Sequence, residues 1–122
     1  MIPLEQQVCS LELAKQLKEL GVKQESLFNW IFVNRPGEIG KWRVAYDWDP
    51  LYVDSGNISA FTVAELGEML PANYCSGRWE NGYWWCHDSY DRNFDKVQQG
   101  LTEADARAAT LVYMIKNKKI SL

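Results

Sequence analysis

The segment at residues 102–116 constrains the fold of this chain most strongly. It reads TEADARAATLVYMIK, and its apolar residues recur at the spacing of one helical face. This face carries Ala104, Ala108, Leu111, Val112 and Ile115. Such a stripe is typical of a helix that lies on a flat apolar surface. The segment therefore predicts a helix that covers a sheet, with Thr102 placed to cap its first turn.

Two further segments carry helix signals. Ser10 precedes an apolar stripe over residues 10–20, and Gly21 follows the stripe where a left-handed residue ends many helices. In the stretch ISAFTVAELGEMLP, Thr62 and Glu65 have the spacing of a capping box. Phe61 and Leu66 flank that box as a hydrophobic staple, and Pro71 ends the short helix.

Aromatic and β-branched segments predict the strands. LFNWIFV at residues 27–33 carries apolar groups on both faces, which predicts a central strand, and WRVAYDW at 42–48 alternates cleanly in side-chain type. The turn at 34–40 between them predicts an antiparallel hairpin. YWWCHD at 83–88 predicts a third strand, and 94–98 a fourth at the edge. We expect residues 1–9 to be a loose or edge segment, 49–57 an irregular connection and 72–82 a loop.

The order of these elements is α-β-β-α-β-(β)-α. Strands in hairpins, with helices set apart from them, favour the α+β class over a doubly wound parallel fold. We expect one domain over residues 1–122, with an antiparallel sheet of three to four strands and helices packed on one face. A chain of 122 residues is large enough to fold around its own core without a metal or disulfide.

Composition bears on the partner and the compartment. The formal net charge is −3 and the pI is about 5.1, which disfavours nucleic acid as a partner. Cys9, Cys75 and Cys86 are odd in number and form no CxxC pair, so a reducing cytoplasm is expected. The start of the chain has no signal-peptide pattern, and no apolar run has the length of a membrane span.

Three blocks together resemble a known family. VCSLELAKQLKELGVKQESLFNW (residues 8–30), ISAFTVAELGEMLP (58–71) and TEADARAATLVYMIKNKKI (102–120) are similar to a family of small phage and prophage proteins, found mainly in gut anaerobes and their viruses. The resemblance implies a phage-derived protein in the cytoplasm of a bacterial host. The family has no assigned activity, so no functional residue is carried over. The matching blocks are the helices and their caps.

The residues that could carry chemistry are few. Cys86 and His87 could form a nucleophile and its base, but adjacent strand residues point to opposite faces. A zinc site from Cys9, Cys75, Cys86 and His87 lacks the short ligand spacing of structural sites. We therefore expect Cys86 to pack inward with Trp84, and we predict no catalytic residue, cofactor or metal.

Residues 91–95 open like a calcium-binding loop. Asp91, Asn93 and Asp95 have the D-x-N-x-D spacing of such a loop. Lys96 then stands where the loop needs glycine, and Thr102 where it needs glutamate. The stretch is therefore interpreted as a solvated acidic turn.

The aromatic content is the unusual feature of the chain, which has six Trp and six Tyr residues. Three short helices on one sheet face leave some of these rings uncovered, and exposed aromatics favour binding to other proteins or to ligands. The candidate binding residues are Trp42, Tyr46 and Trp48 as one face, with Tyr83 and Trp85 as a neighbouring row. Loops that fold over the sheet, or strands that curl, are the structural alternative.

Two functions from different classes remain open. The first is a phage accessory module without enzymatic activity, which binds a protein partner or self-associates through the aromatic sheet face. The second is an enzyme or small-ligand binder with an aromatic-lined cleft, in which Asp47, Arg43 or His87 supplies polar contacts. Nucleic-acid binding by base stacking ranks third, because the acidic charge balance opposes it.

Overall fold

The computed structural model describes residues 2–33, 40–46, 58–90 and 97–120. Within these residues it is an α+β fold with two antiparallel sheets of three strands each. The helices are α1 (Leu4–Gln7), α2 (Leu11–Glu19), α3 (Val63–Met69) and α4 (Glu103–Lys116). The strands are β1 (Phe28–Val33), β2 (Lys41–Tyr46), β3 (Ile58–Ser59), β4 (Tyr74–Arg78), β5 (Trp84–Asp88) and β6 (Gln98–Gly100).

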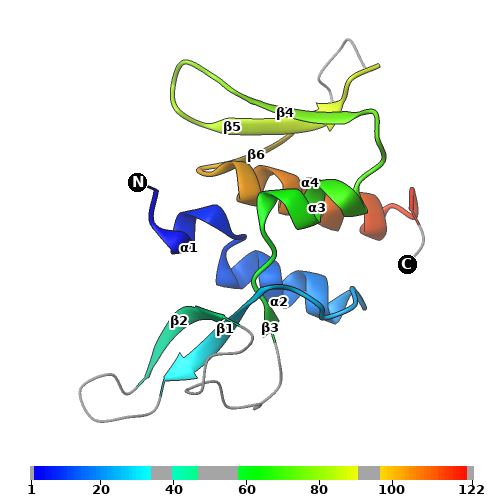
Figure 1. Cartoon of the computed structure of the whole chain (residues 1–122). Helices are drawn as coiled ribbons and strands as arrows, with labels where there is room; N and C mark the ends of the chain where they lie inside the picture. The colour runs from blue at the N-terminus through cyan, green and yellow to red at the C-terminus, as the bar shows by residue number, and fades with distance from the viewer. Residues whose placement is uncertain (1, 34–39, 47–57, 91–96, 121–122) are drawn as a thin grey trace.

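Figure 1 shows the helices as a layer between the two sheets. The sheet of strand order β4-β5-β6 lies against α4, and the sheet of order β2-β1-β3 lies near α1 and α2. The α+β class and the antiparallel pairing predicted from the sequence are confirmed. The strands, however, divide between two sheets on opposite sides of the helices, where one sheet was expected.

Helix α4 is the centre of the core. Thr102 caps it, with its hydroxyl accepting a hydrogen bond from the Asp105 amide at 3.1 Å. The predicted stripe is buried, except that Ile115 is only partly covered. Burial also extends to Ala106, Thr110 and Met114, outside that stripe. The reason is that α4 has the second sheet on one side and α2 and α3 on the other, so it buries more than one face.

Helices α2 and α3 begin and end as their sequence signals predict. The Ser10 hydroxyl accepts from the Leu13 amide, and the turn at Gly21 has a φ of 92°. The Thr62–Glu65 capping box forms with both of its hydrogen bonds. Helix α2 is joined to α4 by the Ser10 amide, which donates to Asp105 Oδ1 at 2.7 Å. Burial raises the pKa of Asp105, and the hydrogen bonds from Ser10 oppose that rise.

The hairpin of β1 and β2 is in the register Trp30 opposite Val44, with Phe28 opposite Tyr46 and Phe32 opposite Trp42. These residues therefore share one face of the sheet. Leu4 and Val8 pack onto the middle of this face, at Val44 and Trp30, and the Trp30 indole donates to the Cys9 carbonyl at 3.0 Å. The aromatic face is thus the face toward the helices.

The predicted loop at 72–82 contains the strand β4, which the sequence interpretation missed. Its sequence YCSGR holds Ser76 and Gly77, two residue types that are common in turns. In the structure Gly77 pairs with Trp85, and a Cβ on Gly77 would lie 2.4 Å from that indole ring. The glycine therefore makes room for a cross-strand tryptophan rather than for a turn.

Three smaller features also differ from the sequence predictions. The segment predicted as loose holds the short helix α1, and buried Val8 forms a bridge with Thr62. Ile58 and Ser59 form β3, which pairs with β1. The edge strand expected at 94–98 is placed at Gln98–Gly100; residues 91–96, like 34–39 and 47–57, lie outside the described part of the chain.

Candidate functional site

The predicted binding residues fall on two different sheets. Trp42 and Tyr46 lie on β2 and are 36% and 44% exposed. Tyr83 and Trp85 lie at β5 in the other sheet, on the far side of the helices (Figure 1), with Tyr83 exposed and Trp85 partly buried. The two groups are therefore not neighbouring rows of one sheet. Trp48 lies outside the described residues.

We define the hairpin surface as Phe28, Phe32, Trp42 and Tyr46. Its rings form two cross-strand pairs, Phe28–Tyr46 with centroids 4.9 Å apart and Phe32–Trp42 with centroids 5.3 Å apart in an edge-on geometry. These separations are typical of favourable aromatic pairs. The helices cover the middle of the face, whereas Phe32, Trp42 and Tyr46 at the ends of the strands remain exposed.

One positive charge lies beside this surface. Lys15 of α2 places its ammonium group 5.0 Å from the centroid of the Trp42 ring, within the range of a cation–π contact. Lys15 is exposed, so this contact adds only modestly to the cross-strand packing of Trp42 against Phe32.

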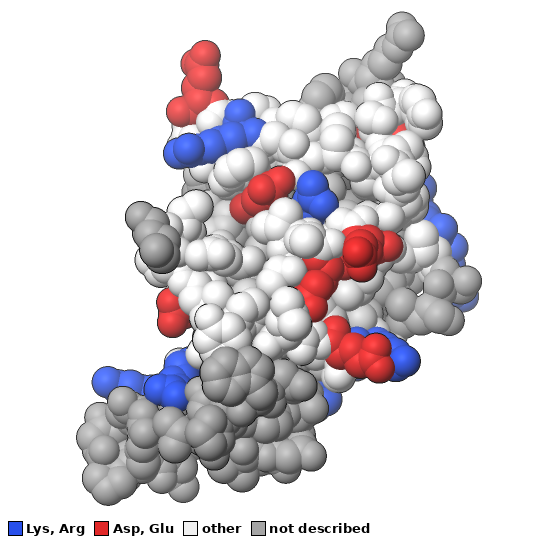
Figure 2. All heavy atoms as spheres, viewed as in Figure 1, with Lys and Arg blue, Asp and Glu red and all other residues white. Residues whose placement is uncertain are grey.

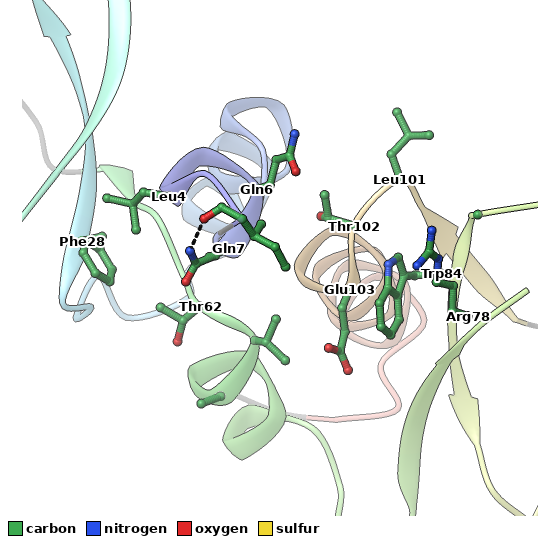
Figure 3. Close-up of a pocket in the computed structure, with 14 residues that line it drawn as sticks. Leu4, Gln6, Gln7, Phe28, Thr62, Arg78, Trp84, Leu101, Thr102 and Glu103 are labelled. Carbon is green, nitrogen blue, oxygen red and sulfur yellow. Dashed lines mark hydrogen bonds between the residues drawn. The ribbon is translucent and has the colours of Figure 1, made fainter.

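A groove of about 500 Å³ lies between α1, the N-terminal ends of α3 and α4, and the turn from β4 to β5. Figure 3 shows Leu4, Gln6 and Gln7 on one side of it and Trp84 and Arg78 on the other. Ile2 and Leu101, which are 60% and 71% exposed, also line the groove. The groove is thus open to solvent, and its walls combine apolar residues with polar and charged ones.

The charged groups in this groove have different surroundings. The Glu103 carboxylate accepts a hydrogen bond from the Ser76 hydroxyl at 2.5 Å and lies 3.6 Å from Arg107 Nη2. Arg107 Nε donates to the same hydroxyl at 3.1 Å. Glu103 is therefore engaged by its own molecule, whereas the Arg78 side chain, which also lines the groove, is exposed. The groove holds no preformed set of paired acids and bases.

The groove and the hairpin surface are continuous. Phe28 lines the groove and is also the ring partner of Tyr46. Of the large apolar residues exposed within the described part of the chain, three belong to the hairpin surface and two to the groove. Exposed apolar residues therefore concentrate on one connected region.

The candidate catalytic pair is not assembled. Cys86 is 1% exposed and packs in the core with Trp84, as predicted, and burial raises the pKa of its thiol. The residue opposite His87 in the sheet is Cys75, and the His87 ring lies 5.1 Å from the Trp85 ring. Arg43 and His87 do not line the groove. Asp47 lies outside the described residues.

The described residues contain no group of three or more His, Cys, Asp or Glu side chains placed to hold a metal ion. Cys9, Cys75 and Cys86 are free thiols, and Cys9 lies in the core beside Phe61. The calcium-loop candidate, Asp91, Asn93 and Asp95, falls in the segment that is not described.

The three thiols should differ sharply in reactivity. Cys9 is fully buried, and burial raises the pKa of its thiol to about 12, so hardly any thiolate forms at neutral pH. Cys75 is partly exposed. We expect Ellman's reagent to modify Cys75 in the folded protein, and Cys9 and Cys86 only after denaturation. In a Cys75→Ser variant, the reaction of the folded protein with Ellman's reagent should then lack its fast phase. Fast labelling of Cys9 in the folded protein would contradict the burial of this residue.

The face drawn in Figure 2 has no continuous basic surface in its described part that could bind a nucleic acid. Acidic and basic side chains are interspersed there, and most of the described surface on that face is uncharged. With a net charge of −3, this distribution is unlike the continuous basic stripe that phosphate backbones need.

Sequence reasoning found part of this region and missed the rest. Alternation along residues 42–48 identified Trp42 and Tyr46, because a strand face is set by nearest neighbours. It did not identify the groove, whose walls come from segments far apart in the chain. The one local sequence signal of the groove was Leu101, directly before the Thr102 cap, since a large apolar residue is unusual in a polar stretch.

None of the helices in the described part of the chain combines the length and the hydrophobicity of a membrane span. No protein-family model, curated protein or solved structure matches the chain.

Proposed function

We propose that this protein is a non-enzymatic binding module, which recognises a protein partner through the hairpin surface and the adjoining groove. The observation that carries the proposal is the exposure of Phe32, Trp42 and Tyr46 on one face of a paired hairpin. Aromatic residues held rigidly at a surface lose little conformational entropy on binding, and they are enriched among residues that dominate interface energies.

The geometry around these rings supports a protein partner. The rings stand at the ends of a strand face, and the groove continues from Phe28 toward Leu101. A partner that covers both would bury exposed apolar residues, which is the arrangement of a hydrophobic interface core. Within the described residues we find no assembled catalytic group that would favour an enzyme.

The biological setting is proposed from the sequence blocks. Residues 8–30, 58–71 and 102–120 resemble phage and prophage proteins, so we propose an accessory protein that acts in the cytoplasm of a bacterial host. A partner encoded by the phage or by the host would fit this setting equally.

The test is capture from host lysate with the wild type and with Trp42→Val, followed by titration of the partner that is identified. Valine keeps the strand preference and the backbone N–H but removes the ring. We expect Trp42→Val to weaken binding by about thirtyfold or more, as for an interface hot spot. Tyr90→Ser is the matched control, because Tyr90 is 82% exposed and lies outside this region.

Binding that survives Trp42→Val and is lost with Tyr90→Ser would refute the hairpin surface as the binding site. The result would then point to the region around the second sheet. Circular dichroism of both variants confirms that the comparison is made between folded proteins.

The groove supports a second candidate, the binding of a small apolar ligand. Its volume of about 500 Å³ is within the range of ligand pockets, and apolar residues line much of it. Ala64 is exposed and lines the groove, so Ala64→Trp should fill part of it. We expect fragments that shift the amide resonances of groove residues to lose that effect in Ala64→Trp. Shifts that persist there would place the fragments elsewhere.

A further inference from the structure

Among the described residues that line the groove, Arg78 and Glu103 carry a charge. They differ in how far their own molecule satisfies them. The Glu103 carboxylate accepts a hydrogen bond from Ser76 and lies 3.6 Å from Arg107 Nη2. Arg78 is exposed, and no described side chain forms a hydrogen bond or an ion pair with it. The negative charge of the groove is thus compensated, whereas its positive charge is not.

The strand pairing determines where the Arg78 side chain lies. Arg78 is the last residue of β4 and is opposite Trp84 of β5, so both side chains leave the same face of the sheet. Figure 3 shows the two side chains next to each other on one wall of the groove. A Cβ on Gly82, in the turn that also lines the groove, would lie 3.9 Å from Arg78 Nη2. The guanidinium group therefore lies close to this turn, beside a large aromatic ring.

Apolar side chains line the groove around this charge. Ile2 and Leu101 are exposed, and Leu4 and Trp84 are half-buried. A ligand that fills the groove removes their apolar surface from water, which favours binding in proportion to the area covered. The same ligand also removes water from Arg78. Because a desolvated cation without a partner is costly, a ligand that fits this groove carries an anionic group opposite Arg78.

A carboxylate matches this site better than a phosphate does. The guanidinium fork donates two parallel hydrogen bonds to the two oxygens of a carboxylate. Phosphate groups carry up to two negative charges and are typically bound by clusters of arginine residues. The described groove residues supply a single cation, and their other charged member is the acid Glu103. One negative charge is therefore the complement of this site.

We infer that the groove binds a short extended segment of the protein partner, in which an acidic side chain pairs with Arg78 and adjacent apolar side chains contact Leu101 and Trp84. This inference rests on the proposed function, and it names the chemistry of the partner. A polypeptide is favoured over a free apolar acid because the groove is open to solvent and continues through Phe28 onto the hairpin surface. A segment in the groove thus belongs to a partner that also covers Trp42.

The first test is selection from a displayed library of random linear peptides, on the wild type and on Arg78→Glu. We expect the wild type to enrich peptides that have Asp or Glu beside apolar residues. Arg78→Glu should enrich Lys or Arg at the same position instead, because a reversed charge repels a carboxylate. Wild-type peptides without an enriched acid, or the same peptides from both selections, would contradict the inference.

Titration of a fluorescein-labelled consensus peptide measures the size of the effect. Arg78→Gln should raise the Kd about fivefold or more, since the ion pair is covered by the bound peptide. Lys119→Gln is the matched control, because it removes an exposed cation outside the groove, and it should change the Kd less than about twofold. A peptide whose acid is replaced by glutamine should bind the wild type and Arg78→Gln equally, as a double-mutant cycle requires for a direct pair.

The neutral peptide also keeps the test decisive if Arg78→Gln folds poorly, because it is measured on the wild type alone. Equal affinity of the acidic and the neutral peptide for the wild type would overturn the inference. Ala64→Trp, which fills part of the groove, should abolish binding of the acidic peptide; unchanged binding would place the peptide elsewhere and count against the inference.

Trp42→Val distinguishes this inference from the proposed function. A peptide confined to the groove should bind Trp42→Val within about twofold of the wild type, whereas the whole partner should not. A selected peptide that depends on Trp42 and not on Arg78 would refute the inference and leave the proposed function intact. A peptide that depends on Arg78, with a captured partner that is insensitive to Trp42→Val, would support the groove site and contradict the hairpin surface.

Discussion

Phe61→Ala is expected to lower the free energy of unfolding by about 3–5 kcal/mol, the usual cost of truncating a buried phenylalanine. Phe61 has no exposed surface and is among the largest fully buried side chains. It lies in the main core with Leu17, Leu66 and Leu111, which come from α2, α3 and α4. The alanine variant leaves a cavity at the point where these helices meet, and denaturant titration measures the loss.

Leu101→Ala is the matched control for this truncation. Leu101 is 71% exposed, so its removal should change the free energy of unfolding by less than about 0.5 kcal/mol. Because domains of this kind are stable by only about 5–15 kcal/mol, Phe61→Ala should show partial unfolding well below the midpoint of the wild type. A loss below about 1 kcal/mol for Phe61→Ala would mean that the three helices do not meet at this ring.

Glu65→Ala is expected to cost about 3 kcal/mol, although Glu65 lies at the edge of the core. Its carboxylate accepts from the Ser26 hydroxyl at 2.7 Å, the Leu27 amide at 3.1 Å and the Thr62 amide at 2.9 Å. The first two donors belong to the segment that leads into β1, and the third is the cap of α3. One side chain thus fixes the first sheet to a helix end, and hydrogen bonds to charged groups contribute about 1.5–3 kcal/mol each.

Two variants separate the hydrogen bonds from other effects of the substitution. Glu68→Ala removes an exposed carboxylate from the same helix and should cost less than about 0.5 kcal/mol. Glu65→Gln should be intermediate, because an amide keeps one acceptor oxygen and replaces the other with a donor. If thermal unfolding showed the same small loss of stability for Glu65→Ala and Glu68→Ala, the link between α3 and β1 would be absent.

Helices α2, α3 and α4 could be predicted from the sequence because their signals are local, whereas the short helix α1 was not predicted. A cap, an apolar stripe and a terminating residue all lie within a few turns, and the structure confirms them at Ser10, Thr62 and Thr102. The β1–β2 hairpin was predicted for the same reason. Its two strands are close in sequence, and side-chain type alternates clearly along residues 42–48. The α+β class follows from these elements.

Strand β4 was missed because its partner determines it. Strand β4 contains Ser76 and Gly77, which favour a loop, yet pairing with β5 satisfies its backbone. Trp85 of β5 needs the space above that glycine. A strand with a low intrinsic strand preference is thus stabilised by a neighbour with a high one. Such pairing contacts cannot be inferred from the sequence of the first strand alone.

The sequence by itself determined helices α2, α3 and α4, their caps, the aromatic hairpin and the antiparallel character of the strands, because each depends on residues that are near one another in the chain. Only the tertiary structure decided that the strands form two sheets, that α4 is buried between a sheet and two helices, and that Phe28 and Leu101 line one groove. These arrangements depend on which apolar faces meet. Several pairings of faces bury similar areas, and the choice among them is made by packing across the whole chain.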